Sequence, residues 1–324
     1  MPTWGEIIEE LQQVASRENI IPFDSVRKKY LAKLQQKTGR NVILYATKWM
    51  QTDVNVDPNS LSITFEDLQG LMEVIHGLNG GALDLIVHSP GGLAEATEAM
   101  VSYLRTKFQN IRVIIPQAAM SAATMLACSA NSIVMGKHSF LGPIDPQMMV
   151  LTKLGPKAVP AHDILKQFQL ARTECRDPAN LGSWMPILEQ YGPALLVECD
   201  NAIQLSESLV SEWLSNYMFL GAGDAEEKAK RIAQYLSNHD NFRTHSRPIS
   251  RTKARELGLY IEDLERDQEF QDLVLSIYHA TTHTFNGTNA LKIIENHRGK
   301  AFMKTMNLPP PPVQPPEPAG QGRS

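Results

Sequence analysis

Short runs of β-branched and aliphatic residues alternate along this chain with longer segments in which apolar residues recur every three or four positions. Four runs have the character of buried strands: residues 41–47 (NVILYAT), 83–88 (LDLIVH), 111–116 (IRVIIP) and 132–135 (SIVM). Between them, amphipathic helices are predicted at residues 64–78, with Phe65, Leu68, Leu71, Met72 and Ile75 on one face, and at residues 93–108. Strands that alternate with helices of this length predict right-handed βαβ units and a mainly parallel sheet, which is an α/β fold.

Helical patterns also dominate both ends of the chain. Residues 1–37 carry heptad-like apolar positions among many charges, and further helices are predicted at residues 193–217, 224–236, 250–257 and 267–282. We therefore expect an N-terminal helical extension (1–40), an α/β domain with a helical C-terminal part (41–285) and a terminal segment (286–306). The proline-rich residues 307–324 cannot bury a core, so a flexible tail is predicted there.

Composition excludes several function classes. Apolar residues make up 43% of the 324 residues, and the net charge of −4 gives no reason to expect nucleic acid as a partner. The three cysteines have no metal-binding spacing, so we expect a reduced interior without metal or cofactor, in the cytoplasm. The acidic start does not resemble a signal peptide, and no membrane span is predicted because no apolar run reaches about 20 residues.

The strongest local signal is a pair of strand ends about 30 residues apart. The first, H-S-P-G-G at residues 88–92, contains two glycines that permit a sharp bend and leave a backbone N–H uncovered. In the second, residues 116–124 (PQAAMSAAT), a strand leads through small residues into a helix, with Ser121 at the turn. A serine at a helix start lies near unpaired amides, which are the donors that a tetrahedral oxyanion requires.

Each of these features also has an ordinary structural role. Ser121 is in a position typical of a helix N-cap, residues 90–92 are typical of a tight turn, and Ser89 before Pro-Gly is typical of a turn residue. Either motif alone therefore favours the structural role. Their order along the chain and their separation by one βα unit favour a serine nucleophile with a backbone oxyanion site.

The chain also resembles a known family. The H-S-P-G-G turn, A-M-S-A-A-T-M around Ser121 and L-G-P-I-D-P-Q at residues 141–147 are similar to the serine dehydrogenase proteinase family, a relative of signal-peptide peptidase SppA and of the Clp protease proteolytic subunit. R-P-I-S at residues 247–250 and A-R-E-L-G-L at 254–259 resemble the C-terminal segment of that family. The resemblance covers roughly residues 40–264 and is weaker over 148–193.

The resemblance implies a fold, an activity and three site residues. The fold is the Clp/crotonase-type α/β spiral of ββα units with helical N- and C-terminal extensions, usually assembled into homo-oligomers. The activity is that of a serine peptidase acting on a peptide or protein substrate. Ser121 matches the nucleophile, and the amides of Gly92 and Ala122 match the donors of the oxyanion hole.

The general base is predicted less directly. The position at which the Clp subunit has its histidine corresponds to Ile144, which cannot accept a proton, whereas SppA relatives use a lysine some 40 to 50 residues after the serine. Lys166 has a suitable distance and apolar neighbours, and an apolar pocket would lower its pKa toward neutrality. Lys153 and Lys157 are rivals in the same stretch, and a surface lysine is the ordinary alternative for each of the three.

Three further residues are candidates for supporting roles. Asp145 follows the substrate-binding strand of the fold and could orient a base, although hydrogen bonding within its loop is the favoured role. His88 precedes the glycine turn, where an active-site role and a structural role are equally compatible with the sequence. His138 lies in a predicted turn, where a surface histidine is the default expectation.

Two other functions stay open at this point. A crotonase-type acyl-CoA enzyme would use the same two amides, but generally with carboxylates, and no acidic residue occurs between Pro116 and Asn131. A catalytically inactive scaffold or binding protein is the second, because the histidine of the Clp triad is missing. No phosphate-binding loop is present, so any ATP-driven unfolding would come from a partner.

Overall fold

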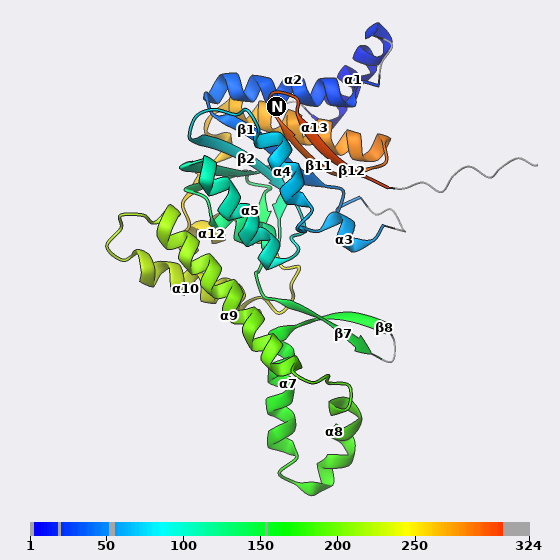
Figure 1. Ribbon diagram of the computed structural model, residues 1–324, viewed down its shortest axis with the longest axis vertical. Helices are drawn as coiled ribbons and strands as arrows, with labels where there is room; N and C mark the ends of the chain where they lie inside the picture. The colour runs from blue at the N-terminus through cyan, green and yellow to red at the C-terminus, as the bar shows by residue number, and fades with distance from the viewer. Residues whose placement is uncertain (1–2, 19–20, 52–55, 153–154, 307–324) are drawn as a thin grey trace, which may run out of the picture.

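The structure is a computed structural model that describes residues 3–18, 21–51, 56–152 and 155–306 (Figure 1). Its centre is a seven-stranded sheet with the strand order β10-β5-β3-β2-β1-β11-β12. The parallel strands are β1 (Asn41–Thr47), β2 (Ala82–His88), β3 (Asn110–Ile115), β5 (Ser132–Met135) and β10 (Ile261–Asp263). Two antiparallel strands, β11 (Ala290–Asn296) and β12 (Ala301–Thr305), complete one edge.

Helices cover both faces of this sheet, which explains why its strands are almost continuously apolar. Alternate residues such as Ile43 and Leu85 face a cluster that includes α4 (Asp67–Ile75), α5 (Ala94–Lys107), α6 (Ala122–Cys128), α9 (Leu195–Trp213) and α10 (Ala225–Ser237). Their neighbours, such as Val42 and Leu44, face α2 (Phe23–Thr38) and α13 (Gln268–Gly287). The α/β spiral expected from the family resemblance is therefore the observed fold class.

Most predicted elements of the α/β part are confirmed, with one error in a helix face. The helix expected at residues 64–78 is α4, but Phe65 and Met72, predicted on its apolar face, are 55% and 59% exposed. The predicted N-terminal helix is two helices, α1 (Trp4–Glu18) and α2. Ser250 caps α12 (Arg251–Leu257), as its sequence predicts, by accepting a hydrogen bond from the amide of Lys253.

Within residues 286–306, which the sequence marks only as a terminal segment, the chain forms β11 and β12 of the central sheet. The remaining short elements are α3 (Pro58–Leu61), β4 (Ala118–Ala119), β6 (Phe140–Leu141), β9 (Ile249–Ser250), α11 (His239–Phe242) and a π-helical turn (Leu214–Met218). Strands β4, β6 and β9 form a second, small sheet beside the first. Its strand β4 carries the chain directly into the turn that holds Ser121, and α6 carries the chain out of it.

An arm projects from the body between β6 and α9 (Figure 1). It consists of the hairpin β7 (Gln147–Thr152) and β8 (Gly155–Pro160) and the helices α7 (Ala161–Glu174) and α8 (Leu181–Leu188). A small apolar cluster of its own joins α7 to the N-terminal part of α9 through Ile164 and Cys199. None of the described helices combines the length and apolarity that crossing a membrane would require.

Candidate active site

The structure brings the two strand-end turns into direct contact. The amide of Ser89 donates to the carbonyl of Ala118 (3.2 Å), and the amide of Met120 donates back to the carbonyl of Ser89 (3.0 Å). On its other side the glycine turn is fixed to Ile63, whose amide donates to the carbonyl of Gly91 (2.7 Å). The end of β2 is thus clamped beside the start of α6.

Glycine is required at both positions of the first turn. Gly91 has φ +98°, and a Cβ there would lie 2.6 Å from the carbonyl oxygen of Met120 and 2.7 Å from the amide nitrogen of Ala122. Gly92 has φ +156°, and its Cβ would lie 2.3 Å from the backbone of Ile63. A side chain at position 91 would therefore push apart the two turns that form the site, and one at position 92 would push the glycine turn away from Ile63.

Ser121 occupies the turn between β4 and α6 with φ 51° and ψ −123°. A positive φ is uncommon for a residue other than glycine, and such strain is concentrated at functional turns that hold a side chain exposed. Although Ser121 is the residue before the helix, its side chain makes no capping hydrogen bond. The ordinary N-cap role considered for Ser121 is therefore not the one that it adopts.

Two backbone amides beside Ser121 are free to bind an anion. Within the described residues, neither the N–H of Gly92 nor the N–H of Ala122 donates to a protein acceptor. The amide of Ala122 is the first of α6, where the positive end of the helix adds to its attraction for negative charge. Two uncovered donors near one hydroxyl are the arrangement that an oxyanion hole needs.

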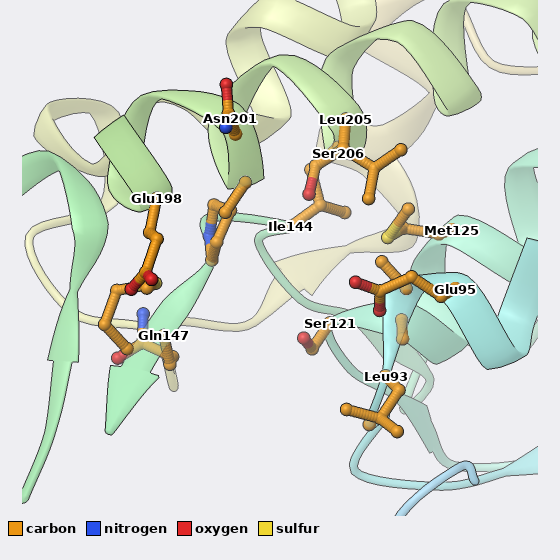
Figure 2. A pocket seen from close by; sticks show the side chains of 16 residues that line it. Leu93, Glu95, Ser121, Met125, Ile144, Gln147, Glu198, Asn201, Leu205 and Ser206 are labelled. Atoms are coloured by element: carbon orange, nitrogen blue, oxygen red, sulfur yellow. The ribbon is translucent and has the colours of Figure 1, made fainter. Parts of the chain in front are cut away.

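The hydroxyl of Ser121 opens into a cavity of about 490 Å³ between the body and the base of the arm (Figure 2). Gly92, Ala122 and the first turn of α5 form the wall on the side of the body. The opposite side is formed by residues 144 and 146–148 and by one face of α9. The cavity is therefore a cleft that is partly open to solvent.

Lys166 does not lie in this cleft. Its Nζ is 2.8 Å from Oδ1 of Asp240, and its side chain is 61% exposed. This hydrogen bond is the first of the causes that lower the pKa of Asp240. The apolar pocket expected around Lys166 is thus absent, because α7 turns this side chain toward solvent rather than toward Ser121. The prediction of an apolar environment is wrong for this conformation.

Two of the other candidate bases, Lys157 and His138, do not line the cleft. Lys157 is exposed on β8, and Lys153 lies outside the described residues. The Nε2 of His138 lies 2.9 Å from the carbonyl oxygen of Pro116, on an exposed turn. Ile144, at the position of the Clp histidine, lines the cleft as an apolar wall. No lysine or histidine lines the cleft among the residues that the structure describes.

Asp145 supports the wall of the cleft. Its carboxylate is 1% exposed and lies 2.7 Å from Nδ1 of His239 and 2.7 Å from Nδ1 of His245, and it accepts a hydrogen bond from Nε2 of Gln147 (2.9 Å). These contacts fix the loop whose neighbouring residues line the cavity. The two histidines follow Asp145 by about 100 residues, so no local sequence signal marks them as its partners.

His88 is buried behind the glycine turn rather than in the cleft. Its ring packs between Trp49 and Tyr278, with centroid distances of 5.7 Å and 5.1 Å. Burial lowers the pKa of His88 to about 3, so the ring is neutral at pH 7. Of the two roles considered for His88, its position supports the structural one.

Two glutamates in the cleft were not anticipated from the sequence. Glu95 comes from the first turn of α5, directly after the glycine turn, and Glu198 comes from the first turn of α9 (Figure 2). The proximity of Glu95 to Gly92 in the sequence could have suggested it. Glu198 could not have been found, because it reaches the cleft only through the packing of α9 over α6.

Comparisons with known proteins find a matching family model, similar sequences and one similar structure. A family model described as ClpP-like SDH-type serine proteinase matches residues 15–283. Two uncharacterized proteins of Methanocaldococcus jannaschii are similar: one is 28% identical over 73% of each chain, and the other 30% identical over 61% of this chain and 59% of its own length. A solved variant of the 1510-N membrane-bound stomatin-specific protease aligns with a TM-score of 0.39 and 14% identity, over 65% of this chain and 79% of that one.

Proposed function

This chain belongs to the family of ClpP-like SDH-type serine proteinases, and from this premise we propose that it is a serine endopeptidase that forms an acyl-enzyme on Ser121. The observation that supports the proposal most strongly is the strained, uncapped Ser121 beside the free amides of Gly92 and Ala122. A family assignment alone would not identify the nucleophile. The geometry of this turn supports Ser121 as the nucleophile rather than Ser89. The side chain of Ser89 is buried and accepts a hydrogen bond from the Gly91 amide.

The proposed reaction proceeds in two steps. Oγ of Ser121 attacks the carbonyl carbon of the scissile peptide, and the carbonyl oxygen takes up the negative charge opposite the amides of Gly92 and Ala122. The C–N bond then breaks, the amine leaves with the proton that Ser121 gave up, and water hydrolyses the ester to a carboxylic acid and restores the hydroxyl of Ser121. Each amide donor is expected to contribute about 3 kcal/mol to transition-state stabilisation, because it is already oriented before charge develops.

The proton of Ser121 also needs an acceptor. Lys166 is the candidate suggested by the resemblance, but in this role it would have to leave Asp240 and its solvated position. We therefore expect Lys166→Ala to retain most of the turnover. A loss comparable to that of Ser121→Ala would instead show that α7 carries Lys166 into the cleft during catalysis.

Hydrolysis of an unstructured protein tests the proposal. Wild-type protein should cleave it, and Ser121→Ala should lower kcat/KM by about 10³-fold or more, because the covalent step is removed. Ser102→Ala, on the exposed face of α5, is the matched control and should retain activity. Unchanged cleavage by Ser121→Ala would disprove the proposed role of this serine.

Two other functions each have one supporting observation. An inactive scaffold is supported by the lack of a lysine or histidine in the described lining of the cleft, and it predicts no cleavage by the wild-type protein. A crotonase-type acyl-CoA enzyme is supported by the carboxylates of Glu95 and Glu198 in the cleft. That enzyme would act on a CoA thioester without a serine nucleophile, so its turnover would survive Ser121→Ala.

A further inference from the structure

We propose that the cleft beside Ser121 selects peptides that carry a lysine or arginine side chain next to the scissile bond. This inference rests on the proposed peptidase function and adds its substrate class. It starts from charge: Glu95 and Glu198 line the cleft, and no lysine or arginine lines it within the described chain. Both carboxylates are exposed, and neither has a hydrogen bond or ion pair with a described residue.

The position of the two glutamates suits a long side chain that ends in a positive charge. Figure 2 shows Glu95 on the side of Ser121 and Glu198 beside Gln147 across the cavity, so the carboxylates belong to opposite walls. Glu95 lies three residues after Gly92, whose amide is the proposed oxyanion donor. A cationic group attracted to Glu95 would therefore lie on the Ser121 side of the cleft.

The inner part of the cleft suits the stem of such a side chain. Met125, Ile144 and Leu205 form an apolar part of the lining (Figure 2). Lysine and arginine combine an aliphatic stem with a charged end, so they can cover apolar surface while the charge reaches an acidic or wet rim. An aspartate or glutamate side chain would face like charges in the same place.

Ser206 provides an independent sign that the cleft binds a polar group. This residue is 4% exposed, its hydroxyl has no partner among the described residues, and its oxygen points into the cavity (Figure 2). The oxygen stays accessible from the cavity, so a polar group that enters the cleft can reach it. The hydroxyl of Ser206 can accept a hydrogen bond from an ammonium or guanidinium group that enters the cleft.

Peptide binding to the Ser121→Ala variant tests this preference without requiring turnover. Fluorescein-labelled peptides of one sequence would carry lysine, leucine or glutamate at a single central position, and their Kd would be measured by fluorescence anisotropy. We expect the lysine peptide to bind about tenfold more tightly than the leucine peptide, the scale of one or two partly exposed ion pairs. The glutamate peptide should bind most weakly, and added salt should reduce the preference for lysine.

Substitutions assign the preference to the two glutamates. Glu95→Gln and Glu198→Gln in the same background should each reduce it, and the double substitution should abolish it. Glu98→Gln is the matched control, because Glu98 is exposed on α5 but does not line the cleft. Equal binding of the lysine and leucine peptides, or a preference that survives the double substitution, would overturn the inference.

The outcomes for the two proposals can be separated. Cleavage of peptides by the wild-type protein without any preference for lysine or arginine would refute the inference and leave the peptidase proposal standing. A lysine preference in binding, combined with no cleavage under any condition, would refute the peptidase proposal and identify a binding site for basic peptides.

Discussion

Ser121 shows how this fold presents one hydroxyl. Small residues around it allow β4 to run directly into α6, and Gly91 lets the neighbouring turn approach within contact distance. The cost is a backbone conformation with φ 51° and ψ −123° that residues with a Cβ rarely adopt. The strain has a measurable consequence for stability.

We expect Ser121→Gly to be more stable than Ser121→Ala by about 1 kcal/mol, because glycine relieves the strain that alanine retains. Urea denaturation of both variants measures this difference. The same pair at Ser102, within α5, should show the opposite sign, since glycine destabilises a regular helix by about 1 kcal/mol relative to alanine. Equal stability of the two Ser121 variants would mean that the turn is not strained.

A second prediction for a single residue concerns His88. Burial lowers its pKa from 6.5 to about 3, so the unfolded chain binds more protons than the folded one between these values. The contribution of His88 to stability is therefore present above pH 6.5 and is lost as the pH falls toward 3. Between pH 7 and pH 5 this loss amounts to about 2 kcal/mol.

Replacing His88 should remove this part of the acid sensitivity. His88→Leu should lose about 2 kcal/mol less unfolding free energy than the wild-type protein when the pH falls from 7 to 5, measured by urea denaturation at each pH. His76→Leu, at an exposed position, controls for the loss of a histidine as such. An unchanged pH dependence in His88→Leu would show that His88 is not held neutral by burial.

The parts of the candidate site that neighbouring residues in the sequence determine could be predicted. The two turns could be predicted from the glycines and small residues at the strand ends, whereas the roles expected of Ser121, Ala122 and Gly92 came from the family resemblance. The surroundings of Lys166 depend on the direction in which α7 leaves the body, and apolar neighbours in the sequence do not determine that direction. The partners of Asp145 depend equally on a distant segment, which explains why they were missed.

At the scale of elements, β11 shows why part of the sheet was not predicted. Its sequence, ALKIIEN, contains two charged residues, yet both Lys292 and Glu295 are fully buried. Lys292 pairs with Asp67 of α4 (2.6 Å), and Glu295 pairs with Arg27 of α2. Because the charged residues of β11 are paired with residues of distant helices, its sequence lacks the apolar pattern from which a buried strand is predicted.

The buried ion pair between Lys292 and Asp67 yields a prediction for strand β11. Lys292→Met should destabilise the protein by about 3 to 5 kcal/mol, because Asp67 would be left as an unpaired buried charge. Lys304→Met on the neighbouring strand β12 breaks a partly exposed pair with Glu66 and should cost less than about 1 kcal/mol. Urea denaturation of the two variants compares them, and equal effects would contradict the tight coupling of β11 to α4.

In the molecule as a whole, the cleft beside Ser121 lies where the arm joins the body. Residues 144–148 and α9 belong to this junction, so the arm supplies part of the wall opposite Ser121. The arm also exposes large apolar side chains: Met149, Leu151, Leu170, Leu181 and Met185. Exposed apolar surface of this kind supports our expectation that the protein forms homo-oligomers. Residues 307–324, expected as a tail, lie outside the described residues.

The central claim is that one hydroxyl, Ser121, reacts as a nucleophile in the folded protein. Incubation with a fluorophosphonate probe, followed by mass spectrometry of the digested protein, tests it most directly. We expect a single phosphonyl adduct on the peptide that contains Ser121, and no adduct in Ser121→Ala. An adduct that persists in Ser121→Ala, or a folded wild-type protein that never reacts with the probe, would contradict the claim.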